Sequence, residues 1–477
     1  MSGQESGKNS DGIARIARLL TLEREELAPA GIGAGYFFFL LLSYYLLRPV
    51  RETFGISGGY DNLPWLMTGT LVAMALASPV FAVFASRVPR RVLVPWTYRF
   101  FAMNIVVFWA LLMFTPRAAH AGIGYGFYIW LSVFNLFVVS VFWAVMADVF
   151  GPKRGRRAFA VAAVGGTLGA IGGAWTAAHL STDFAIKPAW LMLIALVPLE
   201  LAVQCVRLLR PYFDRSRGRD AEGGDTRLAQ SHEPSSDPLA GLKLIASSPY
   251  LIAIAVYIML FTTVGTLVYM EQGRIVEQTF SDRAERVAAF AKLDLWTNVL
   301  TLVTQLFLTA RIVQLIGVRG SLVILPIVNL AGFAALWMNP VFGVLAAFQV
   351  VRRGVHYAVD RPVREMLFTV LGADARYKSK TFIDTFVYRA GDMAGGWSPL
   401  ALKAMGLAVA PVALPVVVVW LGVAAVLGKL HAKQPPLVPP PPPGSTCEVC
   451  GYELAGLDTP GEIVRCPECG ARNTARR

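Results

Sequence analysis

The chain has 477 residues, of which 55% are hydrophobic and 16% charged, and its mean hydropathy is +0.53. A soluble domain this apolar could not cover its surface with polar groups, so the composition excludes an ordinary soluble protein and indicates a membrane protein. The net charge of +13 does not predict nucleic acid as a partner, because the basic residues lie mainly in short segments between apolar runs, as the positive-inside rule describes.

Residues 1–29 form a polar segment that we expect on the cytoplasmic side of the membrane. Within it, Ile13 to Leu27 places apolar residues at helical spacing opposite charged residues such as Arg15 and Glu23. This pattern predicts either a short amphipathic helix on the membrane surface or a solvated lead-in without a role of its own.

Twelve apolar runs follow, each close to the roughly 20 residues with which a helix crosses a bilayer. They predict an all-α membrane protein of the major facilitator type, with two six-helix bundles at residues 30–210 and 249–428. A cytoplasmic linker at 211–248, polar and rich in Gly, Ser and Pro, joins the bundles. The predicted spans are Ala30–Val50, Leu63–Ser86, Val92–Phe114, Gly122–Phe150, Ala158–Leu180, Ala189–Leu209, Pro249–Met270, Ala289–Ile312, Leu322–Met338, Val341–Asp360, Phe382–Ala401 and Leu407–Leu427.

Lys and Arg are concentrated after the even-numbered spans, for example at Arg90 and Arg91 after the second span and at Arg156 and Arg157 after the fourth. The loops after the third, fifth and ninth spans carry few of them. Since basic loops stay in the cytoplasm, both termini are predicted to be cytoplasmic.

The glycines at 165, 169 and 173 have a spacing of four residues within the fifth predicted span. A phosphate-binding P-loop would end in Gly-Lys-Ser or Gly-Lys-Thr, and this ending is missing here. The spacing therefore predicts close packing against another helix.

A charged block, Arg352 to Trp397, lies near the end of the second bundle between apolar runs. Its pentapeptide RPVRE at 361–365 also occurs at 48–52, and its last part aligns without gaps on Lys153 to Trp175. Two halves related in this way are typical of a duplicated transporter. The aligned pairs include Arg156 with Lys378, Gly169 with Gly391, Gly173 with Gly395 and Trp175 with Trp397.

The same block resembles the ATP/ADP translocases, the nucleotide exchangers of plastids and bacteria that are related to the major facilitator superfamily. The family pattern D-P-T-K-E-M-A-Y is similar to the segment at 361–368, K-G-K-A-A-x-D to 378–384, and its glycine-rich helix to 391–396. GGYDNLPWL at 58–66 resembles the family segment G-x-E-x-I-P-F-L. Ser379 stands where the family has Gly and Asp392 where it has Lys. The resemblance implies exchange of ATP for ADP by alternating access, in the cytoplasmic membrane of a bacterium.

Ionisable residues at membrane depth are the candidate substrate site, because a charge there costs about 2.5–3.5 kcal/mol unless it faces the bundle interior or a water-filled path. Arginine suits an anion because its planar guanidinium donates paired hydrogen bonds and keeps its charge. For Arg361, Arg364, Lys378 and Lys380, a cytoplasmic cluster set by the positive-inside rule is the alternative. The acids could be salt-bridge partners of the bases. The predicted substrate-binding residues are Arg48, Arg51, Glu52, Arg361, Arg364, Glu365, Lys378, Lys380, Asp384 and Arg389.

Other ionisable residues in the spans are weaker candidates. Arg352, Arg353, His356, Asp360 and Asp392 belong to the charged block. Glu200 and Asp294 are single acids in other spans and are weaker still.

The tail has a proline-rich spacer at 429–444 and a four-cysteine segment at 445–477. Its two CxxC pairs, fifteen residues apart, have the spacing of a structural zinc ribbon, in which four thiolates hold Zn²⁺. Two disulfides are the alternative, which a reducing cytoplasm disfavours. A ribbon of this kind could dock a protein partner. The predicted ligands are Cys447, Cys450, Cys466 and Cys469.

Three functions therefore compete: a nucleotide exchanger, a carrier of another organic anion or phosphate ester, and a membrane anchor or sensor that no longer transports. An enzyme is not expected, because the sequence shows no nucleophile with its base and no open metal site. The expected partners are the lipid bilayer and an anionic small molecule.

Overall fold

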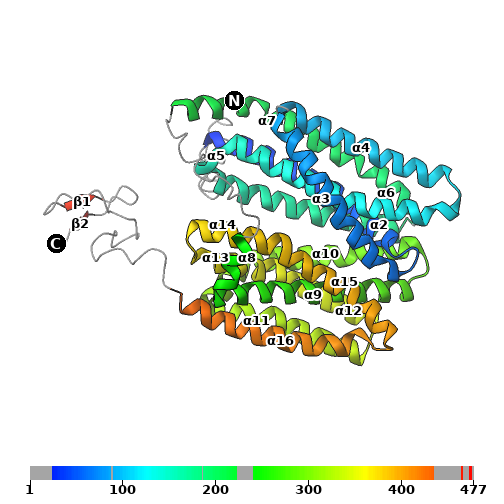
Figure 1. The fold of residues 1–477 in the computed structure, drawn as a ribbon. Helices are drawn as coiled ribbons and strands as arrows, with labels where there is room; N and C mark the ends of the chain where they lie inside the picture. The colour runs from blue at the N-terminus through cyan, green and yellow to red at the C-terminus, as the bar shows by residue number, and fades with distance from the viewer. Residues whose placement is uncertain are drawn as a thin grey trace, which may run out of the picture.

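The computed structural model describes residues 24–87, 90–184, 186–222 and 240–434, and two short strands at 463–465 and 472–474. Most of the predicted amphipathic segment, the middle of the linker and the four cysteines of the tail lie outside these residues. Apart from the strands, the described chain is mainly helical and forms two groups of long helices that run side by side (Figure 1).

The helices of the first half cover the predicted apolar runs, of which the sixth is divided between two helices. Short 3₁₀ turns at Tyr60–Asn62 and Arg117–Ala119 separate some of them. The helices are α2 (Arg24–Gly55), α3 (Leu63–Arg87), α4 (Arg90–Phe114), α5 (His120–Thr182), α6 (Pro188–Ile194) and α7 (Leu196–Glu222).

Helix α5 contains the fourth and fifth predicted spans and folds back on itself. Phe142, in its first part, stacks on Phe37 of α2 at a ring distance of 4.1 Å. Gly166, in its second part, faces the same Phe37 ring. In a straight helix these two positions would be about 36 Å apart, so the two parts pack against α2 as separate spans.

The second half has the same plan, with two interruptions. The tenth and eleventh predicted spans each contain a π-helical turn, at His356–Asp360 and at Ile383–Val387, and such turns are frequent at functional sites. Its helices are α8 (Ala240–Ser247), α9 (Pro249–Thr279), α10 (Arg283–Phe307), α11 (Thr309–Met338), α12 (Phe342–Val355), α13 (Arg361–Thr369), α14 (Ala373–Phe382), α15 (Tyr388–Ala404) and α16 (Val409–Ala432).

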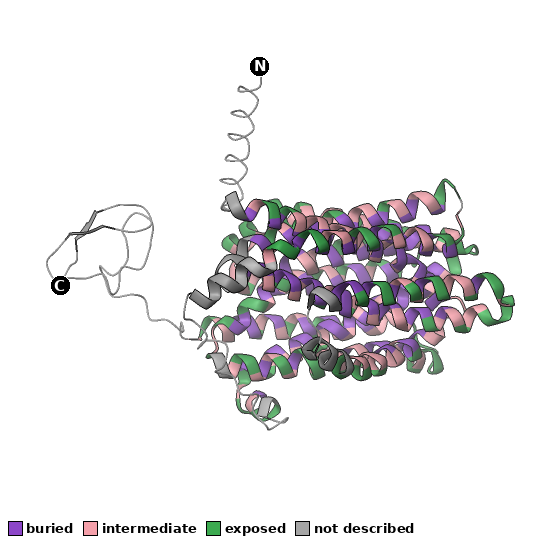
Figure 2. Cartoon of the chain, turned by 90° about the horizontal axis from the view of Figure 1, so that it is seen from above, coloured by how far each residue is buried: buried purple, intermediate pink, exposed green. Residues whose placement is uncertain are grey.

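Nine helices within the described residues are long and apolar enough to cross a membrane. The prediction of several membrane helices is confirmed, whereas the count of twelve stays a prediction. The three remaining predicted spans are also helical, but the tenth and eleventh are divided by their π-turns into helices of 14 and 17 residues. Large apolar side chains of α4, such as Trp96 and Phe100, are exposed, as expected of a surface that faces lipid. Figure 2 shows how buried and exposed positions are distributed along the helices.

Glycine packing shows the internal repeat in three dimensions. A Cβ atom at Gly169 would collide with the backbone of α2 at Phe38, and one at Gly173 would collide with α2 at Leu42. Their sequence partners Gly391 and Gly395 lie equally close to the backbone of α9, at Met259 and Thr263. The predicted packing role is therefore confirmed, and α2 and α9 are equivalent helices of the two halves.

The halves meet most closely at the end opposite the start of α2 and the end of α16 (Figure 1). There Lys403 forms an ion pair with Asp61, and the Tyr60 N–H donates a 2.8 Å hydrogen bond to Glu277. Nearby, the rings of Trp65 and Trp397 are 4.6 Å apart. An apolar cluster that includes Ile56, Leu66, Tyr128, Met270, Phe290 and Leu293 fills the same contact. We call this contact between the halves the closed end.

Candidate functional site

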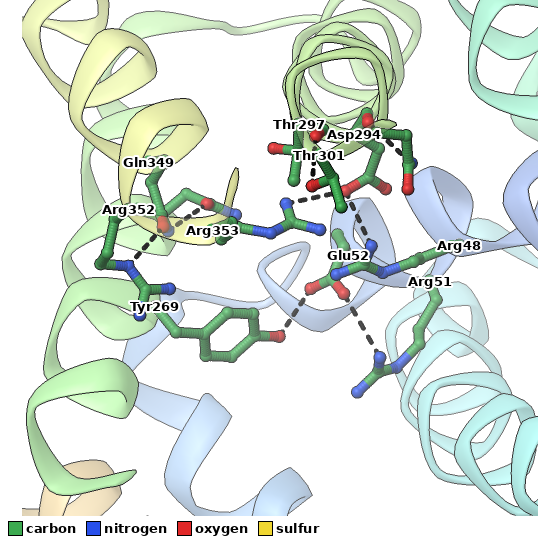
Figure 3. A network of polar contacts seen from close by, with 12 residues as sticks. Arg48, Arg51, Glu52, Tyr269, Asp294, Thr297, Thr301, Gln349, Arg352 and Arg353 are labelled. Atoms are coloured by element: carbon green, nitrogen blue, oxygen red, sulfur yellow. Dashed lines mark hydrogen bonds and ion pairs between the residues drawn. The ribbon is translucent and has the colours of Figure 1, made fainter. Parts of the chain in front are cut away.

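Asp294 of α10 lies at the centre of a charged junction between the halves (Figure 3). Its Oδ1 is 2.8 Å from a guanidinium nitrogen of Arg48, on α2, and also 2.8 Å from one of Arg353, on α12. The Asp294 side chain is only 4% exposed. Because an isolated buried charge is very costly, the carboxylate and the two arginines stabilise one another, and Arg48 ties the first half to the second.

A second polar junction surrounds Glu52, in the last turns of α2 (Figure 3). Tyr269 of α9 donates a 2.6 Å hydrogen bond to its carboxylate, and Arg51 lies 3.3 Å away from the other oxygen. The Arg51 guanidinium sits 4.0 Å above the ring of Tyr128, whose hydroxyl is 2.8 Å from that of Tyr269. Burial of these groups makes the hydrogen bonds a specific link between the halves.

Arg352 is held differently from its neighbours. Its Nε donates a 3.1 Å hydrogen bond to Gln349, whose amide in turn donates to Gln272 at 2.6 Å. Among the residues that the structure describes, no carboxylate lies within ion-pair distance of Arg352. A guanidinium that faces a cavity without a negative partner is a ready site for an anion.

Asp392 of α15 accepts a 3.2 Å hydrogen bond from Thr266 and lies 3.3 Å from Arg389. The sequence placed Arg389 among the substrate-binding candidates and Asp392 among the weaker ones. In the fold, Asp392 lies where two cavities meet, which gives it the more central position.

Two adjoining cavities lie between the halves and share Gly265, Thr266, Tyr269 and Asp392 as lining residues. The first has a volume of about 190 Å³, and Arg48, Arg352, Arg353, Glu52 and Asp294 line it together with aromatic side chains. The second has a volume of about 310 Å³, with Arg51, Arg389 and several apolar residues in its wall. We call the two together the joined cavity.

The predicted site residues divide into two groups in the fold. Arg48, Arg51, Glu52 and Arg389 line the joined cavity. The other predicted residues belong to the charged block and are not among the lining residues of the joined cavity. They are Arg361, Arg364, Glu365, Lys378, Lys380 and Asp384.

Arg361 and Glu365 line a separate cavity of about 490 Å³, which also includes Tyr45 of α2. Arg364 turns into the second half, where it lies 3.0 Å from the buried Asp360 and 4.4 Å above the ring of Phe261. Tyr257 and His356 also hydrogen-bond to Asp360, so this cluster holds α9, the π-turn and α13 together.

Lys380 forms ion pairs with Glu365, at 3.0 Å, and with Asp384, at 3.1 Å, on the side of the charged block next to α14. Burial lowers the pKa of Lys380, but the hydrogen bonds to these two carboxylates outweigh it, so the pKa is raised. Lys378 is half-buried on α14. The substrate-binding role of these residues stays a prediction.

From the sequence, Asp294 is a weak candidate for the substrate site, and Arg352 and Arg353 are not among the predicted substrate-binding residues. A lone acid in a membrane span gives little signal by itself, and only the fold brings its two arginines to it from α2 and α12. Glu200, ranked with Asp294, instead forms a half-exposed ion pair with Arg99, 3.1 Å away on the outer surface of the first half.

The predicted zinc ligands lie outside the described residues. The two described strands of the tail, β1 (Ile463–Arg465) and β2 (Arg472–Thr474), pair antiparallel, and Cys466 and Cys469 lie between them in the sequence. The part of the chain that the structure describes holds no cluster of three or more His, Cys, Asp or Glu side chains suited to a metal. Zinc binding therefore stays a prediction.

The fold of two similar helical halves with a polar cavity between them is shared with solved structures of membrane transporters. Solved structures with this fold include an auto-inhibited peptide transporter of the POT family, with a TM-score of 0.57 and 13% identity over 86% of this chain and 98% of that one. The nucleoside transporter NupG has a TM-score of 0.54 and 10% identity over 85% and 98% of the two chains.

A POT family transporter in complex with 5-aminolevulinic acid is also similar, with a TM-score of 0.56 and 10% identity over 85% of this chain and 96% of that one. At these identities the comparison shows a shared fold. Neither a protein-family model nor a curated protein sequence matches the chain.

Proposed function

We propose that this protein is a membrane transporter that carries an organic anion by alternating access. The observation that carries this proposal is Arg352, a positive side chain that lines the cavity between the halves and has no carboxylate partner in the described chain. A charge kept in such a place is costly, and a passing anion would offset that cost. Transport of this kind needs no chemical conversion of the substrate.

The polar contacts between the halves are the interactions that would break and re-form during transport. Arg48 and Asp294, like Glu52 and Tyr269, connect α2 of the first half with helices of the second. A substrate anion competes with Asp294 for the arginines, and its binding would loosen this link so that the halves can rock about the site. The lost ion pair and the new one are of similar strength, which keeps the two states close in free energy.

Adenine nucleotides are the first substrates to test. The segments at 361–368, 378–384 and 391–396 resemble ATP/ADP translocases, and Phe261, Tyr357 and Tyr388 line the same cavity as the arginines. Guanidinium groups can bind the phosphates, while an aromatic ring can stack on the base. Another organic anion or phosphate ester would use the same arginines, and the test must include both.

The experiment uses purified protein in proteoliposomes that are loaded with ADP or left without it. We expect labelled adenine nucleotide to enter, and to enter faster when the vesicles contain ADP, because exchange returns the loaded carrier to the outside. Entry that does not depend on the load would contradict exchange, and no entry of any nucleotide or other organic anion would contradict the transport proposal.

We further propose that both termini are cytoplasmic, that the protein lies in a bacterial cytoplasmic membrane, and that the four tail cysteines hold structural zinc. Basic loops and CxxC spacing support these proposals. Accessibility of cysteines introduced at the termini would test the orientation, and metal analysis of the purified protein should find one zinc per chain.

A further inference from the structure

The charges of the joined cavity do not cancel. Five arginines line it, namely Arg48, Arg51, Arg352, Arg353 and Arg389, and three carboxylates, those of Glu52, Asp294 and Asp392. With His356 counted as neutral, the lining carries a surplus of two positive charges.

Each of the three carboxylates has a hydrogen-bond donor or a guanidinium group beside it. Asp294 accepts from two guanidinium groups at 2.8 Å, and Glu52 accepts from the Tyr269 hydroxyl at 2.6 Å and lies beside Arg51. Asp392 accepts from Thr266 and lies beside Arg389. Hydrogen bonds to a carboxylate favour its charged form, so we count all three carboxylates as negative charges.

The surplus is located in the first cavity. Glu52 and Asp392 balance Arg51 and Arg389, whereas the single carboxylate of Asp294 is shared by Arg48 and Arg353. Arg352 has no carboxylate partner among the described residues. The anionic group of a ligand is therefore expected beside Arg352. A group of two negative charges balances the site, whereas three or four would leave buried negative charge without a partner.

The second cavity fits an uncharged group. Its wall contains Met67, Leu71, Met74 and Met393, with the rings of Tyr44 and Tyr128. Methionine and aromatic side chains form adaptable apolar surfaces that accept planar rings. Tyr269 and Thr266 lie between this apolar region and the arginines.

We propose that the joined cavity selects a ring-bearing phosphate monoester of two negative charges, such as a nucleoside monophosphate, over nucleoside di- and triphosphates. This inference rests on the proposed function and narrows its substrate. A phosphate monoester carries nearly two negative charges at pH 7.5, and each further phosphoryl group adds about one more.

The test measures how AMP, ADP, ATP and adenosine compete with labelled AMP for the purified wild-type protein at pH 7.5. We expect AMP to compete at least about tenfold better than ADP or ATP, because one unbalanced charge near the site is worth more than a factor of ten at the effective dielectric constant of a protein. Adenosine should compete weakly, because it leaves the arginines unbalanced.

Two variants of Asp392 test whether the net charge of the cavity sets the preference for AMP. Asp392→Asn adds one positive charge to the site, so the preference for AMP over ADP should fall at least about tenfold. Asp392→Glu keeps the charge and should keep the order of preference, even if uptake slows. The melting temperature of each variant shows that it is folded.

The outcomes separate this inference from the proposed function. If ADP or ATP competes as well as AMP in a protein that exchanges nucleotides, the charge inference is wrong while the transport proposal stands. An unchanged AMP preference in Asp392→Asn would also overturn the inference. If adenosine competes best, or if no anion binds or is transported, both are wrong.

Discussion

At the scale of single residues, the main property of the site is that its arginines outnumber its carboxylates. Asp294 serves two arginines from different halves, and Arg352 has amide groups rather than a carboxylate beside it. Charged hydrogen bonds of this kind are worth about 1.5–3 kcal/mol each. A small number of substitutions should therefore change both the stability of the contact and the affinity for anions.

Asp294→Asn tests the shared carboxylate. It leaves two buried guanidinium groups without a negative partner, and breaking a buried ion pair costs about 3–5 kcal/mol. We expect a lower melting temperature, which should recover in part when a substrate anion is added, because the anion replaces the lost charge. Glu285→Gln, an exposed acid on the same helix, is the control and should change stability much less. A variant as stable as the wild type would argue against the junction.

At the scale of helices, the repeat works through glycines that bring backbones together. Gly169 and Gly173 set α5 against α2 in the first half, and Gly391 and Gly395 set α15 against α9 in the second. Small residues are the usual contact of membrane helices, because lipid gives no hydrophobic drive for helices to associate. The same contact in both halves keeps the helices that carry Arg48 and Tyr269 in equivalent positions.

Gly169→Ala tests this contact. The added methyl group meets the α2 backbone, which cannot move aside as a side chain can, so we expect a loss of about 1–3 kcal/mol in stability. Gly172→Ala is a matched control on the same helix, because its Cβ would lie 3.5 Å from the Leu42 side chain in ordinary contact. Thermal unfolding of both variants in detergent checks the prediction, and equal melting temperatures would contradict it.

At the scale of the whole molecule, the closed end and the joined cavity represent one of the two states of the carrier that we propose. The Asp61–Lys403 ion pair and the Trp65–Trp397 contact must separate when the other state forms. Groups at this end therefore control access to the cavity without touching a substrate in it.

A cross-link between the halves tests this motion. In a Trp65→Cys, Trp397→Cys protein treated with a short bismaleimide, we expect exchange to stop while anion binding continues from the opposite side. Each single-cysteine variant, treated in the same way, controls for reaction at the native cysteines. Full exchange after complete cross-linking would show that this end does not open.

Much of this fold follows from hydropathy and repetition, because long apolar runs, basic loops and paired glycines are local signals. The predictions of several membrane helices and of the glycine packing are confirmed, and the fold is similar to that of solved transporters. The residues of the site are harder to predict from the sequence. Arg48, Arg51, Glu52 and Arg389 line the joined cavity as predicted site residues, but Asp294 and Arg352 gain their importance from contacts between helices far apart in the chain.

The two π-turns show why the charged block is hard to interpret from sequence. Arg352 and Arg353 precede the first π-turn and line the joined cavity, whereas Arg364 follows this turn and lies beside Asp360. The extra residue of a π-turn changes which side chains of the following helix face inward. Regular helical spacing cannot predict this change, because a π-turn adds a residue without a distinct sequence signature.

The most direct test of the account compares anion affinity in Arg352→Gln with that in Arg311→Gln, an exposed arginine of α11. Because Arg352 has no carboxylate partner in the described chain, its replacement should not lower the melting temperature, yet it should weaken equilibrium binding of the transported anion by about ten- to a hundredfold. Arg311→Gln should bind like the wild type. If Arg352→Gln is folded and binds the anion as tightly as the wild type, the claim that this cavity exists to bind anions is contradicted.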